Sequence, residues 1–556
     1  MEPFAPWRRF YGDVKSHLEY PDCTIWEAVR RTAEKYPEST ALIYLNRKVS
    51  YKEMIKRIEA VRWGFVKLGV KKGDRVLIAL PNTLQAVYTL YGLSSLGAVA
   101  CFVHPLASIG ELDECLKITN ADILVVFSSL EKALKGSSCI KGKSVVVTAL
   151  CDEVAKFKFQ FAGQSRNKRS YKRFCWSEIM TNSEKRERFC AQTDCNEPAV
   201  VIFSGGTTGK QKGALISSFA LNAMATGTKE ISGCEIAGKS MLAVMPLFHG
   251  FGLGVCVHTA LMHGGCAILV PRFFAEKCGK NIKKYRPSFI AGVPAMLEAL
   301  MKSKSLSKAD LSFLAGVFSG GDTLQAELKS KLDGYLKERG AKIKVREGYG
   351  LTECIAVSCL APCDLQKKGS IGIPLPDTYY KICKEGTTAS LPAGKVGEIC
   401  VTGPTLMLSY LGEEAETKRA LRLHSDGRVW LHTGDAGLMD KDGFVYFKGR
   451  IKRMIVTNGY NVYPSQVERV LNSHSAVKLC CVVGVKDPCK TERVKAFVVS
   501  RDNKDKEKLK AELFSLCEEQ LSPFAVPREI EFVSSFPKTK VGKIDYKTLE
   551  LKGIGT

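Results

Sequence analysis

The stretch 204–213, SGGTTGKQKG, brings four glycines, three hydroxyl side chains and two lysines into ten positions. Glycines let the backbone turn sharply, and the exposed N–H groups and hydroxyls of such a turn can surround phosphate oxygens. The stretch is not a Walker A loop, because Ser204 stands where that motif has its first glycine and Gln211 follows Lys210. Taken alone, a Gly/Thr loop is weak evidence for phosphate binding, and an ordinary turn is the simpler interpretation.

Seven further segments change that interpretation, because they follow in one order along the chain. They are MPLFHGFGLG (245–254), GVPAM (292–296), SGGDTL (319–324), EGYGLTEC (347–354), WLHTGD (430–435), GRIKRMIVTNGYNVYPSQVE (449–468) and PKTKVGKIDY (537–546). Together they resemble the acyl-adenylate-forming (AMP-binding) superfamily, which includes acyl- and aryl-CoA synthetases, firefly luciferase and peptide-synthetase adenylation domains. The resemblance covers residues 24–550 and is strongest to bacterial medium- and long-chain fatty-acid–CoA ligases.

The resemblance implies a ligase reaction in two halves that uses ATP, Mg²⁺ and coenzyme A. A carboxylate attacks the α-phosphate of ATP, which gives acyl-AMP and pyrophosphate, and the thiol of coenzyme A then displaces AMP. The carboxylate is already ionised at neutral pH, so the first half needs no general base. The obstacle is repulsion between anions, so the site must supply positive charge and alignment.

The same resemblance assigns ATP-binding roles to individual residues. The β- and γ-phosphates would be held by Ser204, Thr207, Thr208 and Lys212. Tyr349 would stack on adenine, whose other face would be lined by Gly321, Asp322 and Thr323. Thr352 would contact the α-phosphate and Glu353 would carry Mg²⁺. The usual LPKG ending is replaced by Lys210-Gln211 before Lys212-Gly213, which puts the stiffness of the loop in doubt.

The C-terminal motifs would complete the catalytic machinery. Asp435, with Arg450, would bind the ribose hydroxyls, and Lys543 would neutralise charge developing at the α-phosphate. Lys452 would be the hinge about which a small domain rotates between the half-reactions, and Gly459 would let the pantetheine arm pass closely. In this last loop Gln466 replaces a commonly seen Glu, which leaves one polar contact open.

The acyl group would occupy a pocket lined by small residues and one histidine. Its predicted lining is His249 with residues 250–254, Pro294, Ala295, Gly320, Gly348 and Cys354. A lone histidine in an uncharged stretch is usually a core residue, and only the resemblance makes His249 a lining or gating residue. Small side chains leave room for a bulky or long acyl group, but the chain length cannot be read from them.

The elements that position these residues alternate between helix and strand. Thr24–Glu27 and Ser50–Glu53 have the capping-box pattern that opens helices. Apolar runs predict strands at 75–80, 98–103, 122–127, 144–150, 199–203, 267–270, 289–291, 316–318 and 342–346. Strands that alternate with helices favour an α/β fold with doubly wound, largely parallel sheets in a large N-terminal domain.

The pattern changes after residue 370. Runs at 395–402, 428–433 and 444–447, with turns such as Asp442-Gly443, predict a small antiparallel β-barrel-like part. The last hundred residues mix strands at 479–485, 494–500 and 529–533 with helices that end near 471 and span 506–520. We therefore expect an adenylation domain at 1–449, a hinge at 450–453, and a small mobile α+β lid domain at 454–556.

The formal net charge of +25 suggests an anionic partner, although solvated surface charge explains it equally well. The densest basic run, Ser165–Phe174, is predicted to be an exposed loop. A nucleic-acid-binding protein would interleave such charges with aromatic residues, and Tyr171 alone is thin support. We expect no nucleic-acid partner, and contact of 165–174 with anionic lipid stays an open alternative.

The 21 cysteines are scattered without a CxxC pair, and Cys354, Cys359 and Cys363 have no second cluster to complete a zinc site. Many free thiols, and no apolar leader in MEPFAPWRRF, predict a cytoplasmic protein. Two uncharged stretches, 80–103 and 241–271, are broken by polar residues, glycines or prolines, so we expect them in a soluble core rather than in a membrane.

Two alternatives to the activation of a fatty acid for transfer to coenzyme A stay open, and a third is disfavoured. The acid could be aromatic or steroid-like, or the acceptor could be the thiol of a carrier protein. A nucleotide-binding pseudoenzyme is disfavoured by retention of Glu353, Asp435, Arg450 and Lys543. The oligomeric state, monomer or homodimer, cannot be read from the sequence.

Overall fold

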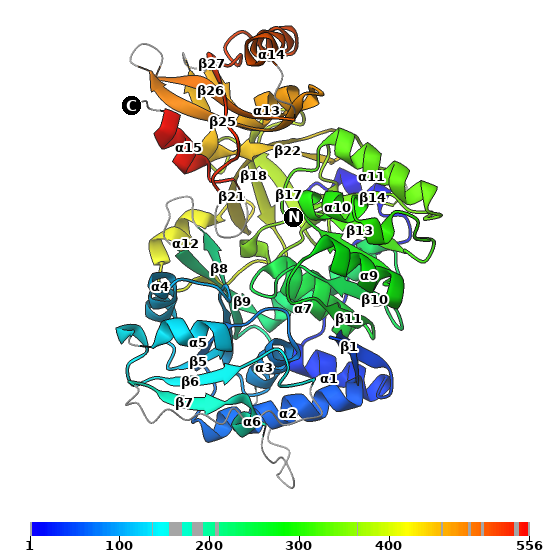
Figure 1. Ribbon diagram of the computed structural model, residues 1–556, viewed down its shortest axis with the longest axis vertical. Helices are drawn as coiled ribbons and strands as arrows, with labels where there is room; N and C mark the ends of the chain where they lie inside the picture. Colours follow the sequence, from blue (N-terminus) through cyan, green and yellow to red (C-terminus); the bar gives the residue numbers. More distant parts are fainter. Residues whose placement is uncertain are drawn as a thin grey trace. The chain divides into compact units, whose positions relative to one another are not determined.

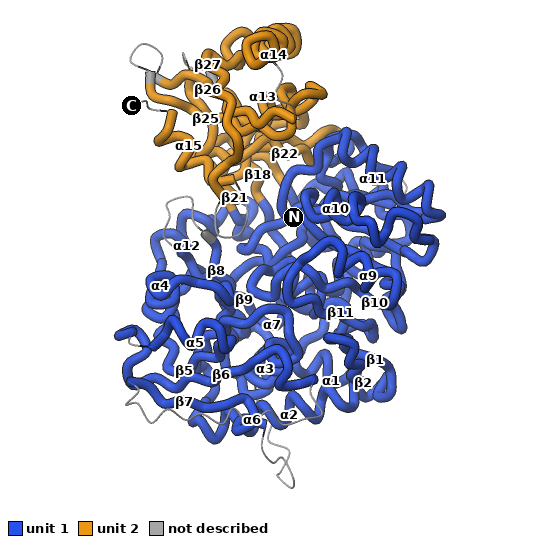
Figure 2. The backbone as a smooth tube through the Cα atoms, in the orientation of Figure 1, with its two compact units in different colours: residues 1–380, 401–431, 442–444 blue, residues 381–400, 432–441, 445–556 orange. Residues whose placement is uncertain are grey.

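The computed structural model describes residues 3–135, 137–154, 170–180, 193–205, 211–363, 365–457, 460–487, 491–501, 505–538 and 544–553. The chain forms two compact units, coloured separately in Figure 2. Unit 1 comprises residues 1–380, 401–431 and 442–444, and unit 2 comprises residues 381–400, 432–441 and 445–556. The expected domain boundary and hinge at 449–453 stay predictions.

An eight-stranded sheet in unit 1 has the order β19-β9-β8-β4-β3-β5-β6-β7, of which Figure 1 labels β5, β6, β7, β8 and β9. Its strands are β3 (Arg75–Ala79), β4 (Val99–Phe102), β5 (Ile123–Phe127), β6 (Ser144–Thr148), β7 (Lys172–Cys175), β8 (Pro198–Gly205), β9 (Gln211–Ser217) and β19 (Ser409–Tyr410). The strands from β8 to β7 are parallel, whereas β9 pairs antiparallel with β8 and β19 pairs antiparallel with β9. The crossover helices are α3 (Leu84–Ser94), α4 (Ile109–Thr119) and α5 (Ser128–Leu134), and α6 (Trp176–Ile179) follows β7.

A nine-stranded sheet, also in unit 1, has the order β16-β15-β14-β13-β12-β10-β11-β1-β2. Its strands are β1 (Thr40–Tyr44), β2 (Arg47–Ser50), β10 (Ser240–Ala243), β11 (Cys266–Leu269), β12 (Phe289–Gly292), β13 (Gly316–Ser319), β14 (Val345–Tyr349), β15 (Cys359–Leu360) and β16 (Ile373–Pro374). The six central strands are parallel. The doubly wound α/β architecture is thereby confirmed.

Further helices of unit 1 lie before or between the strands of the nine-stranded sheet, so helices and strands alternate as the sequence predicts. They are α1 (Ile25–Lys35), α2 (Tyr51–Lys67), α7 (Ser218–Ser232), α8 (Thr259–Met262), α9 (Ala275–Tyr285), α10 (Pro294–Met301) and α11 (Ala326–Glu338). The hydroxyls of Thr24 and Ser50 accept the backbone N–H groups of Glu27 and Glu53, so the predicted caps open α1 and α2.

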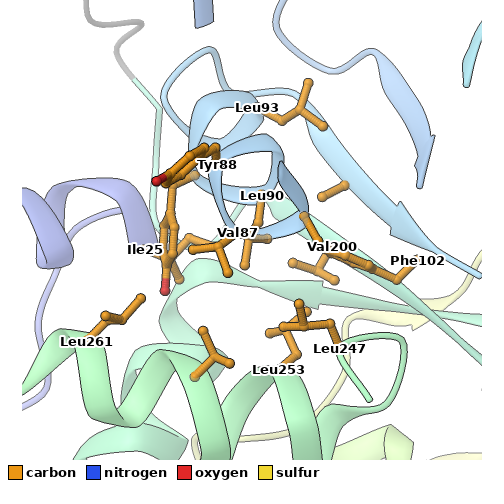
Figure 3. Close-up of a cluster of buried hydrophobic side chains, with 14 of the residues drawn as sticks. Ile25, Val87, Tyr88, Leu90, Leu93, Phe102, Val200, Leu247, Leu253 and Leu261 are labelled. Atoms are coloured by element: carbon orange, nitrogen blue, oxygen red, sulfur yellow. The ribbon is translucent and has the colours of Figure 1, made fainter. Parts of the chain in front are cut away.

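The uncharged stretch 80–103 lies in the main core. All residues of α3 are buried, and Figure 3 shows Val87, Tyr88, Leu90 and Leu93 among side chains from neighbouring strands and helices. Within the described ranges, no helix combines the length and the apolar character needed to cross a bilayer. Every cysteine in those ranges carries a free thiol.

The antiparallel part is a five-stranded sheet of order β17-β18-β21-β20, with β22 paired to β21. Its strands are β17 (Tyr379–Cys383), β18 (Gly397–Thr402), β20 (Leu421–Leu423), β21 (Val429–Met439) and β22 (Val445–Arg450), and α12 (Glu414–Ala420) precedes β20. Over the described residues the sheet is open, so the barrel-like expectation needs correction to an open sheet. The division between the units falls within β17, β18 and β21.

The remainder of unit 2 is an α+β fold, as expected. Its sheet has the order β24-β23-β26-β25, and β27 pairs with β26. The elements are η6 (Ile451–Arg453), β23 (Ile455–Thr457), β24 (Tyr460–Val462), α13 (Pro464–Ser473), β25 (Val477–Asp487), β26 (Thr491–Ser500), α14 (Lys506–Gln520), β27 (Glu529–Phe532) and α15 (Tyr546–Gly553).

The basic run 165–174 includes most of an edge strand. Residues 165–169 lie outside the described residues, but Lys172–Cys175 forms β7, which pairs in parallel with β6. Tyr171 is buried and Arg173 forms an ion pair with Glu131 at 2.7 Å. The expectation of an exposed loop is therefore wrong for this part, because the strand adds to the edge of a buried sheet and Arg173 has an acidic partner.

Candidate active site

The glycine-rich stretch lies at the end of β8 and the start of β9. These strands form an antiparallel pair whose register places Ser204 opposite Lys212. The connecting residues 206–210, which include Thr207 and Thr208, lie outside the described residues. A strand therefore runs directly into the predicted phosphate loop, and Ser204 and Lys212 stand at its two ends.

Lys212 is half-buried and has two partners in unit 1. Its ammonium group forms an ion pair with Glu416 of α12 and lies 5.1 Å from the centroid of the Tyr410 ring. The hydrogen bond from Lys212 lowers the pKa of Glu416 below its usual value. Glu416 also pairs with Arg419 at 2.5 Å. The cation predicted to hold phosphate is thus held by a carboxylate in this structure.

Glu353 lies in the short helix η5 (Thr352–Cys354), directly after Thr352. Its Oε1 accepts a 2.6 Å hydrogen bond from the Tyr410 hydroxyl, and its carbonyl oxygen accepts the N–H of Met407 at 2.8 Å. Tyr410 therefore contacts both Glu353 and Lys212. A half-buried carboxylate oriented by a neutral donor fits Mg²⁺, which is commonly held by one or two carboxylates together with substrate phosphates.

The turn around Glu353 is tightly closed. Ile355 and Ala356 have φ values of +44° and +89°, which are uncommon for residues other than glycine. The N–H of Ala356 donates to the carbonyl of Leu351 at 3.1 Å. A Cβ on Gly350 would lie 1.3 Å from the carbonyl oxygen of Ala356, so only glycine fits there. This turn fixes the directions of Thr352 and Glu353.

The predicted adenine-binding residues lie at the ends of two adjacent parallel strands. The register of β13 and β14 places Ser319 beside Glu347, so Gly320–Thr323, which follow β13, start beside Gly348 and Tyr349, the last two residues of β14. A Cβ on Gly320 would lie 3.2 Å from the carbonyl oxygen of Gly348. Tyr349 is half-buried, whereas Asp322 and Thr323 are exposed. The carboxyl edge of an open α/β sheet is the usual place for ligands.

Some of the predicted acyl-pocket residues lie close to the carboxyl edge of this sheet or to the turn that follows Glu353. The ring of His249, which is half-buried, lies 4.7 Å from that of Phe248. A Cβ on Gly250 would lie 3.1 Å from the nitrogen of Ala356, so the stretch 249–250 packs against the turn that follows Glu353. Residues 251–258 then form a π-helix, η3, a rare element that is frequent at functional sites.

The remaining predicted lining residues differ in exposure. Pro294, at the start of α10, and Cys354 are buried, whereas Ala295 is exposed. Unit 1 also has a cavity of about 540 Å³, whose lining contains none of the predicted pocket residues. It is formed by His17, Asp377, Tyr379, Thr402, Gly403, Pro404 and Arg428.

In unit 2 the predicted ribose-binding pair is formed. Asp435 of β21 stands opposite Arg450 of β22, and Arg450 Nε lies 2.9 Å from Asp435 Oδ1. Asp435 is buried, while the Arg450 side chain is half exposed. Lys452 is exposed in η6. Gly459 and Lys543 lie outside the described residues.

Four residues that contact the predicted site residues or their turns were not found from the sequence. Tyr410 and Glu416 contact the predicted site residues of unit 1. Glu398 bonds both His432 and the N–H of Gly434, next to Asp435. His432 stands inside WLHTGD, which could have drawn attention to it, and Glu398 is the one charged residue of the strand Gly397–Thr402. Nothing local marks Tyr410 or Glu416.

Comparison with protein families decides the relationship that the motifs suggest. The model of the AMP-binding enzyme family matches residues 29–411, and that of the AMP-binding enzyme C-terminal domain matches residues 466–543. The chain belongs to the AMP-binding enzyme family. As a member of this family it is an ATP-using, AMP-forming ligase of the acyl-CoA ligase type, which forms carbon–sulfur bonds.

Individual relatives of this AMP-binding enzyme span almost all of it. A long-chain-fatty-acid–CoA ligase of Bacillus subtilis is 30% identical over 98% of this chain and 97% of its own length. A probable 4-coumarate–CoA ligase of Dictyostelium discoideum is 31% identical over 89% of this chain and 88% of its own. Two kinds of acid are thus represented among relatives of similar identity.

Solved structures establish the fold of this AMP-binding enzyme. ATP-bound MatB from Rhodopseudomonas palustris matches with a TM-score of 0.83 at 23% identity, covering 96% of this chain and 99% of that one. An anthranilate CoA ligase in complex with anthranoyl-AMP matches with a TM-score of 0.81 at 23% identity, covering 98% of both chains.

Proposed function

We propose that this enzyme activates a medium- or long-chain fatty acid as acyl-AMP, with release of pyrophosphate, and transfers the acyl group to coenzyme A. The observation that carries the activation step is the contact of Tyr410 with both Lys212 and Glu353. It joins a cation at the glycine-rich loop to a carboxylate suited to Mg²⁺. The choice of a fatty acid is supported by the full-length similarity to long-chain-fatty-acid–CoA ligases.

In the first half-reaction the residues of the chain bind and align two anions. Ser204, Lys212 and the loop residues Thr207 and Thr208 would hold the β- and γ-phosphates of ATP, and Thr352 would hold the α-phosphate. Glu353 would hold Mg²⁺, which offsets charge on the phosphate oxygens when bound. The acid carboxylate then attacks the α-phosphorus, and pyrophosphate leaves. Since no proton has to be removed, alignment and charge are the whole task.

The remaining groups would complete nucleotide recognition and the second half-reaction. Tyr349 would stack on adenine, and Asp435 with Arg450 would bind the ribose. Lys543 would reach the α-phosphate during adenylation. Rotation about Lys452 would then exchange Lys543 for the loop with Gly459, beside which the pantetheine thiol attacks the acyl carbonyl and displaces AMP.

A panel of acids tests the substrate. Pyrophosphate release is measured with hexanoate, decanoate, palmitate, 4-coumarate, benzoate and a bile acid, each with and without coenzyme A. We expect the highest kcat/KM for decanoate or palmitate, and acyl-CoA as the product. A preference for an aromatic or steroid acid would replace the fatty-acid assignment. Turnover only with a carrier-protein thiol would replace coenzyme A as acceptor.

Two variants test the assigned chemistry. Glu353→Gln is expected to lower adenylate formation at least about a hundredfold, because a neutral amide binds Mg²⁺ poorly. Lys543→Ala is expected to abolish adenylation while the enzyme still converts synthetic acyl-AMP and coenzyme A to acyl-CoA. Unchanged adenylation in either variant would remove the corresponding role.

A further inference from the structure

Three consecutive residues of the WLHTGD segment are tied to two consecutive residues of β18. His432 Nδ1 lies 2.7 Å from Glu398 Oε2, and the N–H of Gly434 donates to Glu398 Oε1 at 3.0 Å. Between them, the hydroxyl of Thr433 donates to the carbonyl of Ile399 at 2.8 Å. Residues 432–434 are thus held at each position by the pair Glu398-Ile399.

Burial makes these contacts strong determinants of the backbone. The side chains of Glu398 and His432 are 8% and 2% exposed. A carboxylate in such a place is costly unless its oxygens have partners, and here each oxygen has a partner in the same turn. One possible metal-ligand atom from each of Glu398, Cys400 and His432 lies within 4.8 Å of the other two. Cys400 Sγ also lies 3.6 Å from His432 Nδ1.

These contacts also fix the backbone next to Asp435, the residue that follows Gly434. The Thr433 hydroxyl that donates to Ile399 also accepts the N–H of Asp435 at 3.1 Å. Gly434, whose N–H is held by Glu398, has φ +68°, a left-handed value that turns the chain immediately before Asp435. The backbone on the N-terminal side of Asp435 is therefore fixed by Glu398 through Gly434 and by Ile399 through Thr433.

We infer that Glu398 is a positioning residue that, with His432 and Thr433, sets the Asp435 carboxylate for recognition of the nucleotide ribose. The inference rests on the proposed role of Asp435. A carboxylate that accepts both ribose hydroxyls must be placed accurately, since displacement loses one of the two hydrogen bonds. Loss of the Glu398 contacts therefore reduces discrimination between ribose and 2′-deoxyribose more than it reduces the use of nucleotide as such.

The test compares kcat/KM for ATP and 2′-deoxyATP in pyrophosphate release by the full-length enzyme. Wild type is expected to prefer ATP by at least about tenfold, and Glu398→Gln to lower this preference about fivefold with the KM for the fatty acid unchanged. Thr433→Val, which removes the shared hydroxyl but keeps the side-chain shape, is expected to act in the same direction. Asp435→Asn, which removes the charge and one of the two acceptor oxygens, serves as the reference for weakened ribose recognition.

A matched control removes a buried carboxylate elsewhere. Glu153 in unit 1 is buried, lies 2.5 Å from Arg57 Nη2 and accepts the Trp176 indole N–H at 2.8 Å. Glu153→Gln is expected to lower the melting temperature without changing the ATP/2′-deoxyATP preference. This variant separates a general effect of lost buried contacts from an effect on ribose recognition.

Each outcome decides one part of the inference. Full preference for ATP in Glu398→Gln and Thr433→Val, with the preference lowered in Asp435→Asn, overturns the positioning role and leaves the proposed function intact. An unchanged preference in Asp435→Asn removes the ribose role of Asp435 itself. Should Glu398→Gln fail to fold, Thr433→Val decides alone.

Discussion

The hydroxyl of Tyr410 donates a 2.6 Å hydrogen bond to Glu353 Oε1, and the ring of the same side chain lies 5.1 Å from the ammonium group of Lys212. The pairing of β19 with β9 produces this arrangement, because it places Tyr410 opposite Ala214, two residues after Lys212. One buried aromatic residue thereby contacts both the cation proposed to bind phosphate and the carboxylate proposed to bind Mg²⁺.

Tyr410→Phe is expected to weaken the use of Mg²⁺ while leaving the fold intact. A hydrogen bond to a charged group contributes about 1.5–3 kcal/mol, so we expect about a tenfold increase in the Mg²⁺ concentration for half-maximal adenylate formation. Tyr379→Phe is the matched control, since its hydroxyl accepts a 2.6 Å hydrogen bond from Arg8. An equal Mg²⁺ requirement in Tyr410→Phe and wild type would contradict the role of Tyr410.

Glu416→Gln is expected to lower the KM for ATP about two- to fivefold. Glu416 holds the Lys212 ammonium group in this structure, so phosphate must compete with a carboxylate that contributes up to about 1 kcal/mol as a partly exposed pair. Initial rates at varied ATP measure the effect. Glu414→Gln, on the same helix, is the control, and a raised KM in Glu416→Gln would show that this pair supports the site instead.

Gly350→Ala is expected to impair folding and activity together. The added Cβ would lie 1.3 Å from the Ala356 carbonyl oxygen, so the turn that carries Glu353 must open. We expect a loss of about 2–4 kcal/mol in the free energy of unfolding and at least a tenfold loss of kcat/KM. Gly334→Ala, inside α11 with no atom within 4 Å of its added Cβ, should instead stabilise the chain by about 0.5–1 kcal/mol. Urea unfolding compares the two, and equal stabilities would contradict the steric argument.

Glu347 is expected to make stability depend on pH near neutrality. Burial raises its pKa from 4.5 to about 7, with a further increase from Asp333 that Lys329 opposes. The folded chain therefore keeps a proton that the unfolded chain releases between about pH 4.5 and 7, so stability falls as the pH rises through this range.

Glu347→Gln tests this dependence, because an amide does not titrate. Between pH 5 and pH 8 the variant should gain on the order of 2 kcal/mol relative to wild type in urea unfolding. Glu327→Gln, at the exposed start of α11, should show no such gain. A constant difference between Glu347→Gln and wild type across the pH range would exclude a raised pKa.

Buried parallel strands were predictable to within a residue or two, because strands covered on both faces are short apolar runs. RVLIAL became β3 (Arg75–Ala79), and AVVIF lies inside β8 (Pro198–Gly205). The strand expected at 342–346 is displaced to Val345–Tyr349. Its end pairs with the short antiparallel strand β15 at Gly348 and Tyr349, a tertiary contact that the local pattern does not contain.

Site residues were predictable where they stand in contiguous motifs, and not where they depend on distant partners. The spatial pair Asp435 and Arg450 could be placed because both lie in recognisable segments. Tyr410 is 57 residues from Glu353, and Glu398 is 34 residues from His432, so neither contact can be recognised from the spacing of residues within one motif. Long-range hydrogen bonds of buried polar groups are set by the sheet register, which the sequence does not display directly.

The backbone passes between the two compact units at 380/381, 400/401, 431/432, 441/442 and 444/445. Exchange of the C-terminal part with that of a relative by a single splice near residue 450 would therefore leave 381–400 and 432–441 from the original parent. Exchange of the whole of unit 2 has to include all three of its segments, and the contacting residues Glu398 and His432 lie in the first two. We expect the preference of a chimera for its nucleotide to be that of the parent that supplies residues 381–400 and 432–441.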